Sequence, residues 1–292
     1  MADHPCHTCR RKLASVVKGW TNRSLLKTYS TERRQIAKEL IEFDRRFSRL
    51  FSGRPATDIL DEEGIDLETF KQVFEKGNLF ASGCAVNYAA SLTVAKPGLG
   101  AVNGVRSVVG KQALAPNIPI GMRIPSHKIL NQSDARPWHL QELLPSSGKW
   151  RLIVFAGDLL DHTQFARLSA LADKLSSSDS FMRRYKLRED EAMCSFFEIL
   201  TIHSAPRDKV ELLSLPDIFH PFSQEYGWDY NKVFVDDDSY HEGHGQAYDN
   251  YGIDAKRGCV VIVRPDQYVS WIGELEDVDD MNQFFKGIFR SG

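Results

Sequence analysis

The N-terminal part of the chain has the hydrophobic spacing of amphipathic helices. Across residues 24–51, apolar side chains recur every three or four positions with Arg and Glu between them, which predicts a long helix in one or two segments. Gly53 and Pro55 end it. A shorter helix is predicted over residues 66–76. Because a short helix in water is stabilised mainly by burial of its apolar face, both helices need a partner, and no nearby stretch predicts a sheet for them to cover.

The second half of the chain alternates strand and helix patterns. Apolar runs predict strands, and apolar residues three or four positions apart predict helices. The predicted strands are residues 150–157, 196–203, 232–235, 259–264 and 268–274, the predicted helices are residues 163–175 and 279–289, and residues 207–213 form a short link or strand. The last two strands form a hairpin closed by Pro265 and Asp266. This order is typical of an α/β fold of the thioredoxin-like type, with a mixed sheet whose final hairpin is followed by a helix.

Residues 96–125 are rich in Gly and Pro and predict a long ordered or semi-ordered connector that separates two regions. Within it, Gly98, Gly100 and Gly104 resemble a dinucleotide-binding loop. The third glycine lies one position too far for that motif, and no helix follows at once. Phosphate binding needs a strand, a tight turn and a helix N-terminus together, so we expect a plain flexible loop.

Composition places the chain among globular proteins. It has 292 residues, of which 42% are hydrophobic and 26% charged, with a formal net charge of −2, and this length is compatible with about two domains. The longest apolar runs are far below the ~20 residues that a membrane-spanning helix needs. The first residues, MADHPCHTCRRK, contain no apolar core of a secretory signal. We therefore expect no membrane association and a cytoplasmic protein.

Charge is distributed unevenly along the chain. Residues 1–54 hold 13 Lys and Arg and 5 Asp and Glu, a net charge of +8, so the remainder carries −10. A basic helix occurs at nucleic-acid and membrane surfaces, but no nucleic-acid-binding motif accompanies this one. We expect the charges of this helix to face something other than a nucleic acid or a membrane surface, and we expect no nucleic-acid partner.

The cysteines predict reduced thiols, because their number is odd and their spacings are mostly long. They are Cys6, Cys9, Cys84, Cys194 and Cys259. Cys6 and Cys9 form a C-x-x-C with His4 and His7 interleaved, but a structural zinc site needs four ligands and no second pair follows. The motif also lies in a polar leader, not after a strand at a helix N-terminus, so we expect no redox role.

Residues 236–251 gather acids, aromatic residues and histidines. His241, Glu242 and His244 come close to a zincin motif, but two helical ligands must be four positions apart, and position 245 is Gly. The stretch predicts a structured loop tied by hydrogen bonds between side chains and backbone, with a cation or polar-ligand site as the alternative.

The turn after the first strong strand, residues 156–161 (AGDLLD), contains no cysteine. A redox thioredoxin places its C-x-x-C there, since the thiolate at the helix start is the nucleophile of disulfide exchange. No G-x-S-x-G motif supports a serine nucleophile either. We therefore expect this domain to have a structural or binding role.

Several strings resemble one enzyme family over most of the chain. They are SLLKTYSTERRQIAKELIEFDRRFSRLFSGRP (24–55), SGCAVNY (82–88), GMRIPSHKILNQSDARPWHLQELLPSSGKWRLIVFAGD (121–158), SYHEGHGQAYDNYGID (239–254) and RPDQYVSWIGELEDVDDMNQFFKGI (264–288). Together they resemble the C-terminal part of the phenol 2-monooxygenase family, which are FAD- and NADPH-dependent aromatic hydroxylases. The similarity runs from about residue 12 to the end.

The resemblance implies a division of the chain into four parts. Residues 1–11 are a divergent leader, residues 12–80 a helical remnant of the FAD-binding domain, residues 81–128 a connector, and residues 129–292 a thioredoxin-like dimerisation domain. Complete members also carry a G-x-G-x-x-G, an Asp-Gly and a Gly-Asp motif for the cofactors, and none of the three is present. Residues 12–19 (KLASVVKG) match only the tail of the helix that follows the Gly-Asp motif.

The missing motifs leave no residue to which a family role can be assigned: no catalytic, cofactor-binding or metal-binding residue is expected. The resemblance then implies an association module without independent activity and with no cofactor of its own. Its expected partners are a second copy or a complete flavin monooxygenase, and local disorder is the other outcome for its unpartnered helices. One alternative is that the chain is part of a working FAD- and NADPH-dependent phenol hydroxylase of fungal catabolism or secondary metabolism. Another is a repurposed binding or isomerising protein that uses residues 239–251.

Overall fold

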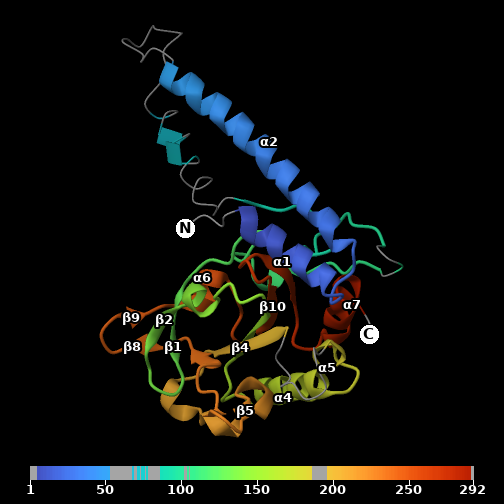
Figure 1. Ribbon diagram of the computed structural model, residues 1–292. Coiled ribbons are helices and arrows are strands. Elements are labelled where there is room, and N and C mark those ends of the chain that lie inside the picture. The colour runs from blue at the N-terminus through green and yellow to red at the C-terminus, as the bar shows by residue number, and fades with distance from the viewer. Residues whose placement is uncertain are drawn as a thin grey trace.

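The computed structural model describes residues 5–52, 86–101, 106–185 and 196–290, together with residues 68, 71–72, 74–75, 77 and 104. A mixed sheet of seven strands forms the centre of the C-terminal body, in the order β11-β10-β3-β4-β7-β1-β2 (Figure 1). β3, β4 and β7 run parallel, and the other neighbours are antiparallel. The strands are β1 Lys128–Asn131, β2 Pro137–His139, β3 Trp150–Gly157, β4 Phe197–His203, β7 Val233–Val235, β10 Cys259–Val263 and β11 Val269–Gly273.

The central strands are buried along their whole length, which explains their continuous apolar sequences. Every residue of β3 and β10 is buried. Side chains alternate between the two faces of the sheet: Leu152 and Val154 pack on one core cluster, and Ile153 and Phe155 on the other. The predicted strands at residues 150–157, 196–203, 232–235, 259–264 and 268–274 are therefore confirmed, with ends that differ by at most two residues.

Helices and irregular segments cover the two faces of the sheet. One face carries α4 (His162–Ser176), α5 (Phe181–Arg184) and α7 (Val278–Ile288), whose apolar side chains share a cluster with Leu152 and Val154. The other face carries α6 (Ala247–Tyr251) and apolar residues from 86–94 and 114–124. The Asp161 carboxylate accepts a hydrogen bond from the backbone N–H of Thr163 and so caps the start of α4. The two helices predicted in this half of the chain are confirmed, whereas α5 and α6 were not predicted.

The described residues of 96–125 pack against the sheet of the C-terminal body. The segment follows the outer edge of β11: Lys111 N–H donates to Ile272 O (2.7 Å), Gly121 N–H donates to Val269 O (2.8 Å) and Val269 N–H donates to Met122 O (2.8 Å). An edge strand has unpaired backbone groups, and this segment satisfies them. Gly121 is needed there because its φ is +90° and a Cβ would lie 2.5 Å from Tyr88 O.

Short elements complete the described body. They are 3₁₀ turns at Gln112–Leu114, Leu140–Leu143, Arg207–Lys209, Leu212–Ser214 and Asp217–Phe219, and two small hairpins, β5 (Phe222–Ser223) with β6 (Gly227–Trp228) and β8 (Asp238–Ser239) with β9 (Gly243–His244). The link predicted over residues 207–213 is thus two 3₁₀ turns.

The N-terminal helices pack on the C-terminal body of the same chain. α1 (Pro5–Val17) lies against that body, and α2 (Leu25–Ser52) begins there and extends away from it (Figure 1). Asn22 N–H donates to Ile288 O (2.9 Å), Arg290 N–H donates to Trp20 O (3.0 Å), and the buried Leu25 belongs to the core cluster. The predicted helices were expected to need a partner, and at this end of α2 the distant C-terminal body of the same chain provides it. The long helix predicted over residues 24–51 is confirmed, whereas most of the one predicted over residues 66–76 lies outside the described residues.

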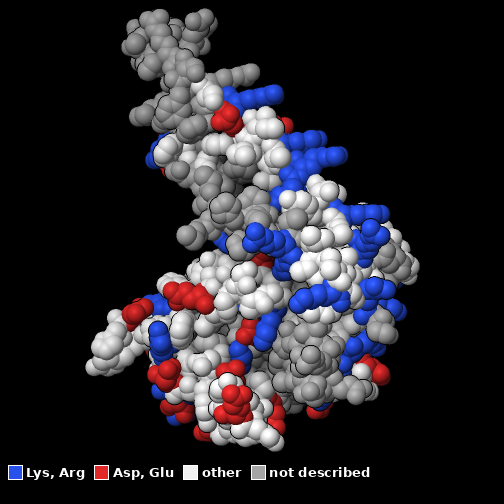
Figure 2. All heavy atoms as spheres, in the orientation of Figure 1, with Lys and Arg blue, Asp and Glu red and all other residues white. Residues whose placement is uncertain are grey.

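Charge on α2 follows the helix period. Its exposed cations stand four and seven positions apart, so they share one side of the helix. They include Lys27, Arg34, Lys38 and Arg45. Figure 2 shows Lys and Arg along this side, whereas Asp and Glu are more frequent on the lower part of the C-terminal body.

Candidate functional site

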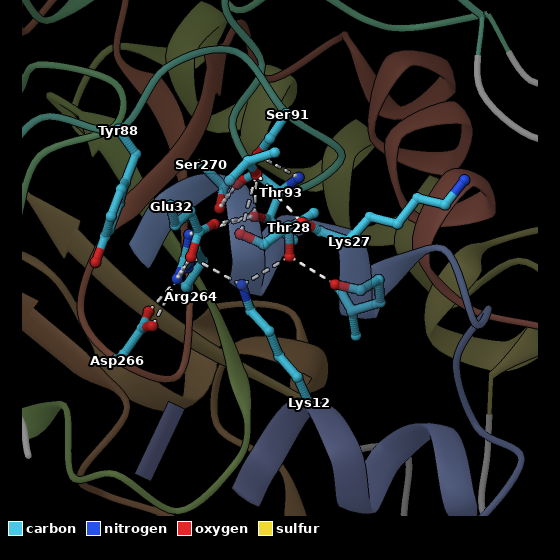
Figure 3. Close-up of polar contacts among 12 residues, drawn as sticks. Lys12, Lys27, Thr28, Glu32, Tyr88, Ser91, Thr93, Arg264, Asp266 and Ser270 are labelled. Atoms are coloured by element: carbon cyan, nitrogen blue, oxygen red, sulfur yellow. Dashed lines mark hydrogen bonds and ion pairs between the residues drawn. The ribbon is translucent and has the colours of Figure 1, made fainter. Parts of the chain in front are cut away.

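The most distinctive site in the described residues is a buried ionic junction between the N-terminal helices and the sheet (Figure 3). Its four charged groups are Lys12 of α1, Glu32 of α2, and Arg264 and Asp266 of the β10–β11 turn. Lys12 Nζ lies 2.8 Å from Glu32 Oε2, Arg264 Nη1 lies 2.9 Å from Glu32 Oε1, and Arg264 Nη2 lies 2.7 Å from Asp266 Oδ2. The four side chains are at most 7% exposed.

Hydroxyl groups complete the bonding of the junction. Lys12 Nζ also donates to Thr28 Oγ1 (2.7 Å), and Thr28 donates to Leu25 O (2.6 Å). Arg264 Nη1 donates to Thr93 Oγ1 (3.2 Å), whose hydroxyl donates to Glu32 Oε1 (3.3 Å). Buried charges are tolerated only when they are paired and hydrogen-bonded in this way.

Two aromatic rings flank Arg264 on the side of the residue 86–124 segment. The guanidinium carbon lies 5.2 Å from the ring centroid of Tyr88 and 5.6 Å from that of Tyr268. These rings lie within the range of cation–π attraction and shield the cation from water. Arg264 therefore contacts α2, its own turn, and Tyr88 and Thr93.

The electrostatics of the junction follow from its burial. Burial and the neighbouring Arg264 lower the pKa of Lys12 to about 8, although Glu32 opposes this. Burial raises the pKa of Glu32, but Arg264 and Lys12 outweigh that effect and bring it below its ordinary value. Burial likewise raises the pKa of Asp266, yet Arg264 and Arg11 hold it well below its usual range. At pH 7 both carboxylates are thus ionised and Lys12 is mostly protonated.

The arrangement is suited to holding elements together and not to chemistry. Both carboxylates bond to cations, and the junction contains no thiol or histidine. Removing one member of a buried pair leaves the other charge buried and unpaired, which typically costs about 3–5 kcal/mol. The junction therefore fixes α1 and α2 on the β10–β11 turn.

A second buried ion pair crosses the middle of the sheet. Arg151 of β3 and Glu198 of β4 stand opposite each other in the parallel register, and Arg151 Nε lies 3.0 Å from Glu198 Oε2. Lys232 Nζ, before β7, lies 2.6 Å from Glu198 Oε1. β3, β4 and the residue just before β7 thus meet at one carboxylate.

Sequence reasoning missed both ionic groups. The available signal was a charged residue within or directly after a fully apolar run, as Arg151 is in WRLIVF and Arg264 is in CVVIVR. Such a residue needs a buried partner, but the sequence does not say which.

The cysteines and histidines do not converge on a metal site in the described part of the chain, where no group of three or more His, Cys, Asp or Glu is placed to hold an ion. Cys6 and Cys9 lie in the first turns of α1. Cys259 is buried in β10, and burial raises the pKa of its thiol.

The stretch at residues 236–251 is a structured loop, as its composition predicted. The Asp236 carboxylate accepts hydrogen bonds from the backbone N–H groups of Ala247 (2.9 Å) and Tyr248 (2.8 Å). The Tyr248 hydroxyl donates to Ile202 O (2.7 Å) and accepts from Gly157 N–H (2.8 Å). His241 and Glu242 occupy the turn of the β8–β9 hairpin.

The glycines at 98, 100 and 104 lie in a loop. Gly98 has a φ of +102° and Gly104 a φ of +74°, and the next described helical turn is the 3₁₀ turn at Gln112–Leu114. No helix among the described residues is both long and apolar enough to cross a bilayer.

Comparison with known proteins assigns the two parts of the chain. Residues 86–292 match the family described as "Phenol hydroxylase, C-terminal dimerisation domain", and residues 5–44 match "FAD binding domain". The chain is 38% identical to phenol 2-monooxygenase fsqG of Aspergillus fumigatus, over 91% of this chain and 40% of that protein. It is 35% identical to the FAD-dependent monooxygenase terD of Aspergillus terreus, over 94% of this chain and 43% of the relative.

A bacterial relative agrees with this assignment, and a solved structure shares the fold. The 3-hydroxybenzoate 4-monooxygenase of Comamonas testosteroni is 32% identical over 96% of this chain and 42% of its own length. The flavin-dependent monooxygenase PieE, solved with FAD and substrate, superimposes with a TM-score of 0.50 at 12% identity, over 96% of this chain and 42% of PieE. The chain thus spans about two fifths of the length of these proteins. It belongs to the phenol hydroxylase family of FAD-dependent monooxygenases and carries that family's C-terminal dimerisation domain.

Proposed function

We propose that this chain is the association module of a phenol 2-monooxygenase-like flavoprotein and has no hydroxylase activity alone. In this proposal the body from residue 129 onward is a thioredoxin-like dimerisation domain, and residues 12–80 are the last helices of an FAD-binding domain. The module works in the cytoplasm, as a homodimer or with a complete flavin monooxygenase.

The observation that carries the proposal is the buried ionic junction. Glu32 lies in the segment that matches the FAD-binding family, and Arg264 and Asp266 lie in the segment that matches the dimerisation family. The three side chains share bonds of 2.7–2.9 Å in a buried site. The two family segments therefore form one rigid unit, so association through the body would set the position of any FAD-binding domain attached to α1 and α2.

The β3–α4 turn does not fit the pyrophosphate of FAD. A pyrophosphate needs backbone N–H groups at a helix N-terminus after a strand. The turn between β3 and α4 has this geometry, but its Asp158 and Asp161 carboxylates accept the N–H groups of Leu160 (3.0 Å) and Thr163 (2.8 Å). Two negative charges at that position repel a phosphate, which supports the absence of flavin binding by this chain alone.

Disulfide exchange is also not supported. The β3–α4 turn carries aspartates where a redox thioredoxin carries its cysteines, and Cys259 is buried with a raised pKa. A structural role for the body agrees with both observations.

Sedimentation velocity and flavin spectroscopy test the proposal. We expect the purified chain to sediment as a dimer at micromolar concentration, to be colourless, and to show no phenol-dependent NADPH oxidation. A monomer that also fails to bind a co-expressed complete monooxygenase would contradict the association role. Stoichiometric FAD with turnover of a phenol would contradict the absence of independent activity.

In the second candidate function, the chain is a segment of a working FAD- and NADPH-dependent aromatic hydroxylase. The match of residues 5–44 to the FAD-binding family, together with coverage of only 40% of the first relative, favours it. Sequencing the native transcript decides between the two. An in-frame upstream region that encodes G-x-G-x-x-G and Gly-Asp motifs supports the hydroxylase, and a transcript without them supports the separate module.

A further inference from the structure

A hollow of about 820 Å³ opens on the C-terminal body at the end farthest from α2, where Figure 1 labels β5. It is lined by residues of the β5–β6 hairpin, of the 3₁₀ turn at Asp217–Phe219, and of α4 and α5. Its aromatic lining residues are Phe222, Tyr226, Trp228 and Tyr230. Tyr, Trp and Phe are enriched at protein interfaces, so this lining is typical of an interaction surface.

Most of these aromatic side chains are exposed instead of packed in the core. Tyr226, in the turn of the hairpin, is 81% exposed, Phe222 is 59% exposed and Tyr230 is 46% exposed. Single exposed hydrophobic residues are normal on a protein surface, but several that gather in one patch mark an interaction site. The hollow is therefore a candidate docking surface, with Tyr226 as a projecting side chain at its rim.

The aromatic side of the hollow is anchored to the body. Phe222 and Trp228 stand opposite each other in the hairpin, and their ring centroids lie 5.1 Å apart at 66°. The Trp228 ring also contacts the ring of the buried His220, with the centroids 5.0 Å apart, and His220 Nε2–H donates to Leu215 O (2.7 Å). A surface that is already ordered loses little conformational entropy when a partner binds.

The hollow carries both signs of charge. Arg183 of α5 and Asp217 both line it and are exposed. In the described part of the chain, neither side chain takes part in an ion pair or a hydrogen bond. A two-fold axis brings the same patch of two copies together, so each residue of a contact occurs twice with the roles exchanged. A patch with one available cation and one available anion can therefore pair twice with a copy of itself.

We propose that two copies of this chain associate through the hollow about a two-fold axis. The inference rests on the proposed association function and names its surface. Arg183 of each copy pairs with the partner's Asp217, and Tyr226 of each copy enters the hollow of the other. A patch with a single sign of charge would repel its own copy, whereas these two charges favour a second copy of this chain as the occupant.

Sedimentation velocity of two charge-reversed variants tests the surface. Arg183→Asp leaves carboxylates facing each other across the axis, and Asp217→Arg leaves guanidinium groups facing each other. Each variant alone should therefore dissociate with a dissociation constant at least about tenfold above that of the wild-type chain. An equimolar mixture of the two variants should restore association, because both opposite-charge pairs form again in the mixed dimer. Both positions are exposed, so the circular dichroism spectrum should not change.

A pair of tyrosine variants tests the aromatic part of the surface. Tyr226→Ser removes the projecting ring and should raise the dissociation constant at least about tenfold. Tyr240, in the turn of the β8–β9 hairpin, is 95% exposed and does not line the hollow. Tyr240→Ser should therefore leave association unchanged.

The outcomes separate this surface from the association function as a whole. A dimer that survives Arg183→Asp or Tyr226→Ser, or two charge variants that do not associate when mixed, would overturn the surface and leave the association function standing. A monomeric wild-type chain that still binds a complete flavin monooxygenase would do the same. A monomer that binds neither would overturn both.

Discussion

Glu32 and Arg264 lie 232 positions apart in the sequence, and Arg264 Nη1 and Nη2 reach Glu32 Oε1 and Oε2 at 2.9 and 3.3 Å. This two-pronged contact joins a helix in the FAD-binding match to a strand turn in the dimerisation match. It is the geometry in which Arg binds a carboxylate most specifically.

Glu32→Gln should destabilise the protein by about 3–5 kcal/mol, because Arg264 and Lys12 keep their burial and lose the shared negative charge. Urea unfolding followed by circular dichroism measures the effect. Glu42→Gln, on an exposed position of the same helix, should change the free energy of unfolding by less than about 0.5 kcal/mol. Equal stability of the two variants would show that the junction does not hold the helices.

Acid should weaken the junction. The pKa values of Glu32 and Asp266 lie below their ordinary values in the folded protein. Unfolded carboxyl groups titrate near pH ~4, so their stabilising contribution is complete above that range and is lost as the pH falls below it. Unfolding free energies measured from pH 7 to pH 3 should therefore decline more steeply in the wild-type chain than in Glu32→Gln. Parallel curves would contradict this assignment.

Gly121→Ala should destabilise the protein by roughly 2 kcal/mol or more, since it combines an unfavourable positive φ with a Cβ placed 2.5 Å from Tyr88 O. Gly98 provides the matched control. Its φ is +102°, but a Cβ added there would have no atom within 4 Å. Gly98→Ala should therefore cost only the backbone strain, about 1 kcal/mol. Thermal unfolding of both variants separates the two contributions.

Cys259 should resist alkylation in the folded protein. Its side chain is fully buried and its pKa is raised, so very little thiolate is present or accessible at pH 8. Iodoacetamide labelling followed by peptide mass spectrometry should find this residue unmodified in buffer and modified in 6 M guanidinium. Labelling at equal rates in both conditions would mean that β10 opens readily.

Strands and helices of the C-terminal body could be predicted where their own residues form a clear pattern of apolar positions. β3, β10, α4 and α7 have long apolar runs or a clear helical period, and the sequence placed each of them within one or two residues. β1 and β2 are short, and β1 pairs with residues far along the chain, so no local pattern marks them. α1 lacks a clear apolar period, so its own pattern did not predict it, and only the family resemblance placed residues 12–19 in the tail of a helix.

The ionic junction could not be predicted from local sequence patterns. Lys12, Glu32, Arg264 and Asp266 are ordinary helix or turn residues in their own segments. Their roles depend on which segments meet, and that contact forms only when α1, α2 and the β10–β11 turn are assembled. Resemblance to a family identified the segments, but it did not supply these side-chain contacts.

The segment along the outer edge of β11 also limits how two copies of this chain can meet. Its hydrogen bonds to Val269 and Ile272 occupy the backbone groups that another subunit would use to extend the sheet. At the opposite edge, β2 is only three residues long and begins with Pro137, which has no N–H to donate. Association of two copies through this body would therefore depend on side chains and not on strand pairing, and surface substitutions would decide which copies associate.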